Sequence, residues 1–266
     1  MADPTPKLDP QAVRSYFSRP GTVSGWWHPE SGPLEFHYEA ELRVLDDHLE
    51  VDPAWRVLDV GTGRGRFGIH FALRGCRVVG VDLSPEMLEI ARRAARERGV
   101  EDRYRAEAGS AEDLSGFDAN GFDVVLCMEL FDHLPDVAAV LRSVRARLAP
   151  GGRLFFTYVP SESIYGALGN VYRFARTRMG SGESLISRTY SLAEIRSRLA
   201  AADLRLERYW GVGLACVNAQ TRLFGESRLL RALTALARAE ARRWPYHDRP
   251  WLARHAAHVV GLARPL

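Results

Sequence analysis

Short apolar segments of strand length alternate with amphipathic segments of helical length along most of this chain. Parallel strands joined by helices form a sheet that is covered on both faces, so the alternation predicts an α/β, Rossmann-like doubly wound fold with seven strands. The expected strands are Arg56–Val60, Arg77–Asp82, Tyr104–Ala108, Phe122–Met128, Arg153–Val159, Leu204–Trp210 and His258–Ala263. The expected helices are Gly65–Leu73, Ser84–Glu97, Asp136–Leu148, Ser191–Ala201 and Ser227–Arg243.

Local signals mark several of these boundaries. Ser84 is a favourable N-cap and Pro85 suits the first helical position. Ser191 and Glu194 have the spacing of a capping box, in which each side chain binds the other residue's backbone. The segment Pro150–Gly152 is expected to end the helix before it.

The alternation is absent or interrupted in three places. Residues 1–50 are expected to form a helical N-terminal cover over a main domain at 51–266. Within that domain, 160–188 has no strand pattern and is interpreted as a lid insertion, and 222–245 is interpreted as a helical insertion. The lid interpretation depends on apolar residues at helical spacing, namely Ile164, Leu168, Val171 and Ala175.

Composition narrows the class of protein. The 266 residues are 46% hydrophobic and 26% charged, as in ordinary soluble globular proteins. No apolar run approaches the roughly 20 residues that cross a bilayer, so a cytoplasmic location is expected. The net charge of +3 comes from interspersed charges, which does not indicate nucleic-acid binding. The three separated cysteines are expected to be reduced and buried.

Three glycines follow the first expected strand directly, at Gly61, Gly63 and Gly65. Glycines at this place allow a tight turn and a close approach of a nucleotide-type ligand to the helix N-terminus. The segment Gly63–Gly68 also fits the dinucleotide fingerprint, which would indicate a nicotinamide or flavin enzyme. However, that match begins two residues late, and the carboxylate of Asp59 would repel a diphosphate while attracting a cationic ligand.

Several of these segments resemble the motifs of class I S-adenosylmethionine-dependent methyltransferases, namely Asp59–Gly65, Val79–Ser84 and Phe122–Val125. Two further segments, Ser110–Leu114 and Cys127–Asp136, are most similar to the ubiquinone-pathway O-methyltransferases. The likeness extends from about Trp55 to Tyr209. It implies S-adenosylmethionine as the cofactor and a small, apolar acceptor, with oxygen preferred over nitrogen or carbon.

The resemblance also implies a donor site. The glycine-rich loop would hold the methionine part, Asp82 the ribose, and the loop after the third strand the adenine edge; Ser110 stands where many such enzymes have an acid. Met128 would line the pocket near the sulfonium. The expected cofactor-binding residues are Asp59, Gly61, Thr62, Gly63, Asp82, Leu83, Ser110, Ala111, Glu112 and Met128.

The segment after the fourth strand holds the candidate catalytic residues Glu129, Asp132 and His133. His133 is the first candidate for a general base, because the intrinsic pKa of histidine is near 6.5; a capping or packing role is the alternative. Together the three side chains could also hold a divalent metal if the loop folds back, although a hydrogen-bonded cluster is the preferred interpretation. His28 and His37 are reserve candidates for the base, within an aromatic segment.

Two other functions compete with this interpretation. An NAD(P)-dependent oxidoreductase would need Asp59 to be neutralised and a catalytic Tyr-x-x-x-Lys or an equivalent, and the sole lysine, Lys7, removes that option. A non-methylating member of the fold, such as a cyclase or a binding module, would keep the donor site without transferring a methyl group. Peripheral membrane contact through 160–188 is a further possibility to test, and the oligomeric state is not predicted.

Overall fold

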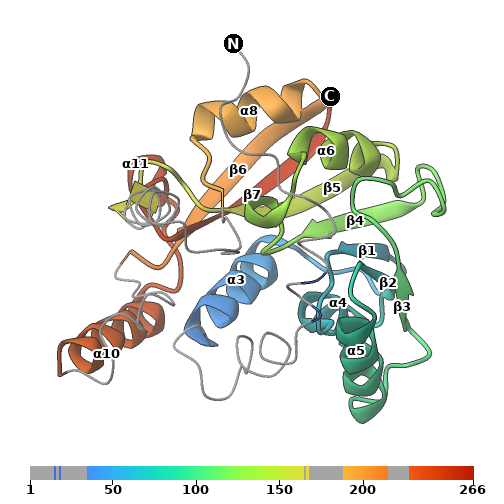
Figure 1. Ribbon diagram of the computed structural model, residues 1–266, viewed down its shortest axis with the longest axis horizontal. Helices are drawn as coiled ribbons and strands as arrows, with labels where there is room; N and C mark the ends of the chain where they lie inside the picture. The colour runs from blue at the N-terminus through green and yellow to red at the C-terminus, as the bar shows by residue number, and fades with distance from the viewer. Residues whose placement is uncertain (1–14, 16–17, 19–34, 165, 168–187, 215–227) are drawn as a thin grey trace.

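The computed structural model describes residues 15, 18, 35–164, 166–167, 188–214 and 228–266. Within these residues a seven-stranded sheet runs through the molecule in the order β3-β2-β1-β4-β5-β7-β6 (Figure 1). All neighbouring strands are parallel except β7, which is antiparallel to both β5 and β6. The strands are β1 Arg56–Val60, β2 Arg77–Asp82, β3 Tyr104–Ala108, β4 Phe122–Cys127, β5 Leu148–Tyr158, β6 Leu204–Val212 and β7 His258–Pro265.

Helices cover both faces of this sheet, as the alternating pattern predicted (Figure 1). One face carries α3 Glu35–His48, α4 Arg66–Leu73 and α5 Pro85–Glu97. The other face carries α6 Val137–Arg145 and α8 Leu192–Ala200. The remaining described helices are η1 Phe131–His133, α10 Arg228–Arg243 and α11 Pro250–Ala253. The predicted Rossmann-like, doubly wound α/β fold is confirmed.

The two faces of the sheet hold separate apolar cores, because successive side chains of a strand point to opposite sides. Val57 of β1 packs into the core under α3, α4 and α5, whereas Leu58 packs into the core under α6 and α8. Val124 and Val125 of β4 divide in the same way. Four consecutive residues of β1 are therefore buried, which is typical of a central parallel strand.

Several predicted boundaries hold, and others are wrong. Ser84 caps α5 through the backbone N–H of Met87, and the capping box of Ser191 and Glu194 begins α8. The segment Pro150–Gly152 does not stop the preceding helix, because α6 already ends at Arg145 and these residues belong to β5. Leu148 pairs with Phe122 across a register shift, so the strand begins earlier than its apolar run suggests.

The edge strands β6 and β7 are longer than predicted because they pair with each other along their whole length. Their register runs from Leu204 opposite Pro265 to Val212 opposite His258. This antiparallel pairing carries both strands past the apolar runs that indicated them. It also places His258, the first residue of β7, at the same end of the sheet as the end of β4.

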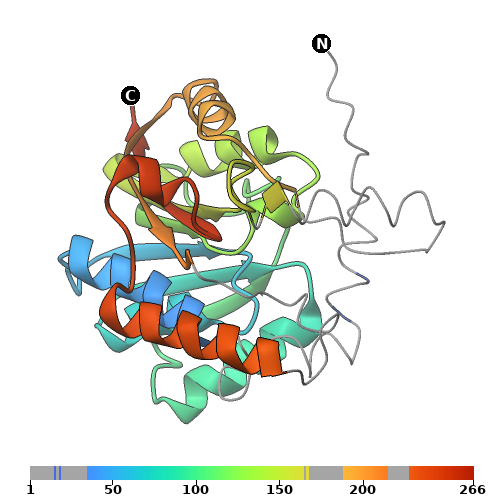
Figure 2. The same ribbon diagram turned by 90° about the vertical axis from the view of Figure 1, so that its left-hand side faces the viewer.

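The helix of the predicted 222–245 insertion, α10, lies beside α3 of the N-terminal cover (Figure 2). Tyr246, just after α10, donates a hydrogen bond to Asp47 of α3, which ties the two segments together. Most of the predicted lid at 160–188 and of the first 34 residues lies outside the described residues. Among the described helices, none has both the length and the apolar character that crossing a bilayer requires.

Candidate active site

The glycine-rich loop between β1 and α4 forms one wall of the site. Gly61, Gly63 and Gly65 have φ values of 71°, 51° and 81°, a left-handed backbone that favours glycine. The backbone N–H groups of Gly61 and Thr62 both donate to the carbonyl of Val81, which holds the loop against β2. A Cβ added at Gly63 would meet no protein atom within 4 Å, so the loop leaves open space at this residue.

Asp59 is buried beneath this loop and stabilises it. Its carboxylate accepts hydrogen bonds from the Thr62 hydroxyl at 2.5 Å and from the backbone N–H of Gly68 at 3.0 Å. Burial raises the pKa of Asp59 to about 6, against the lowering effect of these two hydrogen bonds. The side chain is not among those that line the cavity. The geometry therefore gives Asp59 a role in shaping the loop, and contact with the donor stays a prediction.

Asp82, at the end of β2, connects the glycine-rich loop to the start of α5. Its two carboxylate oxygens accept from the backbone N–H groups of Gly63 at 2.8 Å and Ser84 at 2.9 Å. A carboxylate has about four lone-pair positions, so it can accept further hydrogen bonds from a ligand. Asp82 and the next residue, Leu83, both line the cavity, where the resemblance places ribose and adenine.

The segment after β3 closes the cavity on the β2–β3 side. Ser110, Ala111 and Glu112 all line it. The Ser110 hydroxyl accepts from the backbone N–H of Glu112 at 3.2 Å, so it stabilises the turn of this loop. The Oε1 atom of Glu112 is buried and has no hydrogen-bond partner among the described residues. Glu112 thus offers a buried acceptor at this side of the cavity.

The cavity enclosed by these segments has an empty volume of about 1180 Å³, including its open mouth. On the side of β4 and α3 the cavity wall is mainly apolar. The side chains there are Tyr38, Met128, Leu130, Leu134 and Pro135, and Phe67 of α4 and Met87 of α5 add further apolar lining.

Arg66, the first residue of α4, places a cation in the cavity wall. Its guanidinium lies over the ring of Tyr38, with 3.2 Å between the guanidinium carbon and the ring centroid. Both residues line the cavity. The Nη1 atom of Arg66 is buried without a hydrogen-bond partner among the described residues. The site therefore contains a cation beside the glycine-rich loop as well as an acceptor at Glu112.

The segment after β4 brings two of the predicted catalytic residues together. Asp132 and His133 lie in η1, and the Nε2 atom of His133 is 3.3 Å from a carboxylate oxygen of Asp132. His133 lines the cavity, whereas Asp132 is not among the lining residues. The backbone N–H of Arg188 donates to the carbonyl of Asp132, which holds η1 from outside.

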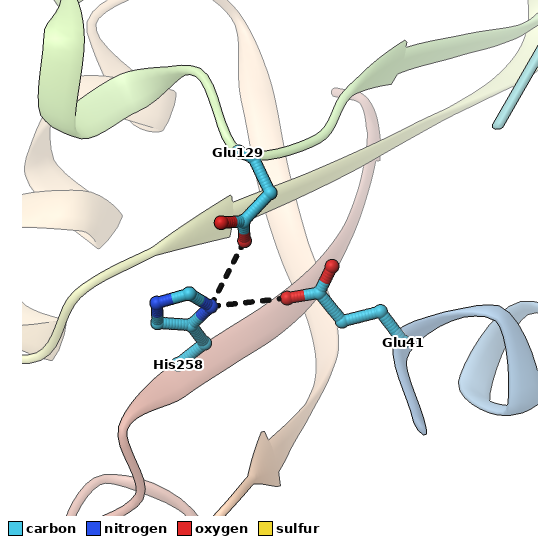
Figure 3. Close-up of side chains that lie close together, drawn as sticks. All are labelled: Glu41, Glu129 and His258. Carbon is cyan, nitrogen blue, oxygen red and sulfur yellow. Dashed lines mark hydrogen bonds and ion pairs between the residues drawn. The ribbon is translucent and has the colours of Figure 1, made fainter. Parts of the chain in front are cut away.

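Glu129 points away from Asp132 and His133, toward α3 and β7. The Nδ1 atom of His258 lies 2.9 Å from Oε1 of Glu129 and 3.1 Å from Oε1 of Glu41 (Figure 3). Glu129, Asp132 and His133, which were considered from the sequence as possible metal ligands, do not come together as such a group among the described residues. Within the described part of the chain, Glu41, Glu129 and His258 form the one group of three such side chains that could hold a metal ion.

The backbone of Glu129 is in the left-handed region, with φ of 54°. Non-glycine residues rarely adopt this conformation, and they do so most often at functional sites. Its backbone N–H donates to the Thr157 hydroxyl at 2.6 Å, and that hydroxyl donates to Oε1 at 3.4 Å. Thr157 of β5 thus fixes both the backbone and the carboxylate of Glu129.

Sequence reasoning missed Glu41, His258 and Arg66 as site residues. One signal for Glu41 was present: Tyr38, Glu41 and Leu45 recur at helical spacing, which places an acid on the buried face of α3. His258 carried no such signal, since its role depends on the antiparallel return of β7. Of the reserve candidates, His28 lies outside the described residues, and the side chain of His37 is also outside them.

Comparisons with known proteins agree with this geometry. A family model described as "Methyltransferase domain" matches residues 57–152. The ubiquinone biosynthesis O-methyltransferase of Hahella chejuensis is 34% identical over 186 residues, covering 68% of this chain and 76% of that protein. The protein of the same name from Xanthomonas axonopodis pv. citri is 38% identical over 133 residues, which span 50% of this chain and only 55% of the relative.

The fold agrees with solved structures of low sequence identity. One is an S-adenosylmethionine-dependent methyltransferase of Thermotoga maritima, named a possible histamine N-methyltransferase. It superimposes with a TM-score of 0.62 at 22% identity, covering 94% of this chain and 98% of that chain. At this identity the likeness shows the fold and not the acceptor.

Proposed function

We propose a function on the premise that this chain belongs to the S-adenosylmethionine-dependent methyltransferases and is similar to their ubiquinone biosynthesis O-methyltransferases. The function is methylation of a small apolar acceptor at oxygen. The observation that carries the proposal is the cavity itself. It joins a polar donor half, at the glycine-rich loop and Asp82, to an apolar half at Met128, Leu130 and Leu134.

The residues present fit S-adenosylmethionine in four places. Gly63 leaves open space where a side chain would obstruct a ligand, and Asp82 retains acceptor positions for ribose hydroxyls. Arg66 Nη1 would pair with the carboxylate of the methionine part. Glu112 Oε1 would accept from the exocyclic amine of adenine. These two buried atoms have no hydrogen-bond partner among the described residues, and each would gain one from the donor.

Glu112 resolves a difficulty at Ser110, which stands where many related enzymes have an acid. The Ser110 hydroxyl is engaged with the backbone of Glu112. The acidic function would thus be displaced by two residues along the loop. A carboxylate acceptor in a buried place makes a stronger hydrogen bond than a hydroxyl would, because the acceptor is ionised.

When bound, S-adenosylmethionine supplies a methyl group on a sulfonium that is already activated. The protein must then align the acceptor and remove its proton. Asp132 engages Nε2 of His133, so the imidazole would take the acceptor proton at Nδ1 while Asp132 stabilises the imidazolium. The apolar wall excludes water from this half of the cavity. Met128, buried at the end of β4, would lie against the donor.

The two ends of the 160–188 insertion lie beside this acceptor half. Pro160 is bridged to Tyr190 next to the end of β5, and Arg188 binds the carbonyls of Asp132 and Pro135. The last residue of the segment, Arg188, is therefore hydrogen-bonded to the loop that carries His133. This placement supports a cover over the acceptor, while membrane contact through the same segment stays a prediction.

Calorimetry and mass spectrometry test the proposal together. The purified protein should bind S-adenosylhomocysteine and not NADH. Incubation with S-adenosylmethionine and a panel of apolar phenols, matched amines and matched carbon acids should add one methyl group to the phenols. Methylation of the amines alone would overturn the choice of oxygen. Binding of the donor without transfer to any member of a broad panel would favour a non-methylating member of the fold.

A further inference from the structure

We propose that Glu41, Glu129 and His258 form a divalent metal site at the floor of the cavity, between α3, the end of β4 and the start of β7. The three side chains come from segments far apart in the sequence and point toward one another (Figure 3). Their ligand atoms all lie within 4.8 Å of one another. This set shares only Glu129 with the sequence motif Glu129–His133, and it does not depend on the identity of the methyl acceptor.

The geometry of the three side chains suits a metal ion. Both carboxylates direct an oxygen at the same atom, Nδ1 of His258, at 2.9 Å and 3.1 Å. A single N–H can donate along a straight line to only one of them. A metal ion would instead accept the lone pair of Nδ1 and one oxygen of each carboxylate. Ligands about 2.1 Å from an ion and at right angles to each other lie about 3.0 Å apart, which matches the two separations measured from Nδ1 of His258.

An unpartnered buried atom supports the same interpretation. Glu41 has no exposed surface, and its Oε2 atom has no hydrogen-bond partner among the described residues. A carboxylate that is removed from water carries a large desolvation cost unless it is paired or coordinates a metal. Bidentate or bridging coordination would engage this second oxygen.

The charges of the cluster balance with one divalent ion. Two ionised carboxylates and a neutral imidazole carry a charge of −2 in a buried place. Mixed imidazole and carboxylate ligands suit Mn²⁺, Fe²⁺ or Zn²⁺ better than Mg²⁺.

The site would be accessible from the cavity. Glu129 lines the cavity, whereas Glu41 and His258 are not among its lining residues. The strained backbone of Glu129 and its two contacts with Thr157 hold the carboxylate at this boundary. An ion here would be enclosed by protein on the side of α3 and β7, and its open coordination positions would face the bound small molecules.

Metal titration of the chelator-treated full chain tests this site. Mn²⁺ binding, followed by electron paramagnetic resonance, should saturate at one ion per chain. Pulsed measurements should show coupling to a directly bound histidine nitrogen, and His258→Asn should abolish it. Glu41→Gln should weaken Mn²⁺ binding at least tenfold and remove the metal-induced rise in melting temperature. The matched controls Asp132→Asn and His133→Asn should bind Mn²⁺ as the wild type does.

Three results would overturn the proposal: no Mn²⁺ or Zn²⁺ binding by the wild type, binding unchanged in Glu41→Gln and His258→Asn, or binding lost in the two control variants. The last result would assign the ion to the Asp132 and His133 pair. Calorimetry with S-adenosylhomocysteine on the same samples shows whether each variant is folded. It also separates failure of the metal site from failure of the donor assignment.

Discussion

The hydroxyl of Thr62 donates a 2.5 Å hydrogen bond to the carboxylate of Asp59, and both side chains are buried under the glycine-rich loop. The same hydroxyl lies 2.8 Å from the phenol oxygen of Tyr104 in β3. The loop that the donor would contact is thus fixed from below by a chain of three polar groups. Since burial raises the pKa of Asp59 to about 6, the charge of these three hydrogen-bonded groups depends on pH.

Asp59→Asn should therefore change how stability depends on pH. In the unfolded chain the pKa of an aspartate is about 3.9, so the folded state holds the proton more tightly. The stabilising effect of this proton is complete below about pH 4 and is lost as pH rises through about 6. Relative to the wild type, Asp59→Asn should gain about 2 to 3 kcal/mol in unfolding free energy between pH 4 and pH 7.5.

Denaturant unfolding of the wild type and of Asp59→Asn at four pH values measures this difference. The contributions of the other titrating groups are shared by the two proteins and cancel when their unfolding free energies are subtracted. Asp118 provides a control of opposite sign, because a hydrogen bond from Arg56 lowers its pKa. The unfolding free energy of Asp118→Asn relative to the wild type should not increase with rising pH. A difference between Asp59→Asn and the wild type that is the same at every pH would contradict the buried, proton-binding Asp59.

Asp82→Ala should weaken binding of S-adenosylhomocysteine by about 1.5 to 3 kcal/mol, the usual worth of hydrogen bonds to a charged group. The variant loses the ribose contact and also the bonds that Gly63 and Ser84 make with the carboxylate. Asp82→Asn should have a smaller effect, because the amide oxygen can still accept. Calorimetry measures both, with the exposed Glu101→Ala as a control. Wild-type affinity in Asp82→Ala would remove Asp82 from the donor site.

Glu112→Ala should reduce the preference for adenine at least tenfold, because a hydrogen bond to an ionised group contributes about 1.5 to 3 kcal/mol. Competition between S-adenosylhomocysteine and its hypoxanthine analogue isolates this contact, because the analogue has a carbonyl in place of the amine. The wild type should prefer adenine strongly, and Glu112→Ala should bind the two ligands more nearly alike. An unchanged preference would return the amine contact to Ser110 or to the backbone.

The sequence predicted those parts of the site that follow directly from local order. The glycine-rich loop, Asp82 and the Ser110–Glu112 loop each come directly after a parallel strand, and parallel strands place their carboxyl ends at one edge of the sheet. The caps of α5 and α8 were equally local, since Ser84 and Ser191 bind residues three positions away. Such features need no knowledge of distant pairing.

The partners of Glu129 could not be predicted in this way. Its spacing to Asp132 and His133 suggested one cluster, but the left-handed backbone at Glu129 turns its carboxylate toward His258. That contact joins residues 129 apart in sequence and depends on the antiparallel return of β7. The sequence likewise does not show that Oε1 of Glu112 and Nη1 of Arg66 are buried without a hydrogen-bond partner among the described residues, because this depends on the burial of individual atoms in the fold.

Gly68→Ala should destabilise the protein although alanine favours helices by about 1 kcal/mol over glycine. Gly68 lies in α4, where a Cβ would come within 2.7 Å of the Tyr104 ring and 2.8 Å of Asp59. Both neighbours are buried, and overpacking a buried site costs about 1 to 3 kcal/mol. The net loss of unfolding free energy should be about 1 kcal/mol. Gly116→Ala, where a Cβ meets open space, should change it little.

His133→Ala should lower turnover by about 100-fold or more while donor affinity stays nearly unchanged, as expected for loss of a general base. His133 lines the cavity beside Leu134 and makes its polar contact with Asp132 at Nε2, so its loss removes the base without touching the donor loop. Asp132→Asn should lower turnover less, because the imidazole remains but its protonated form loses a partner.

Two further measurements on the His133 variant separate catalysis from packing. Added imidazole should restore part of the turnover of His133→Ala, since the truncated side chain leaves space for a free base beside Leu134. It should not restore His133→Phe, in which the ring fills that space and cannot take a proton. S-adenosylhomocysteine affinity in both variants should match the wild type. Unchanged turnover in His133→Ala would assign this residue to packing, and the acceptor proton would then leave through another group in the cavity.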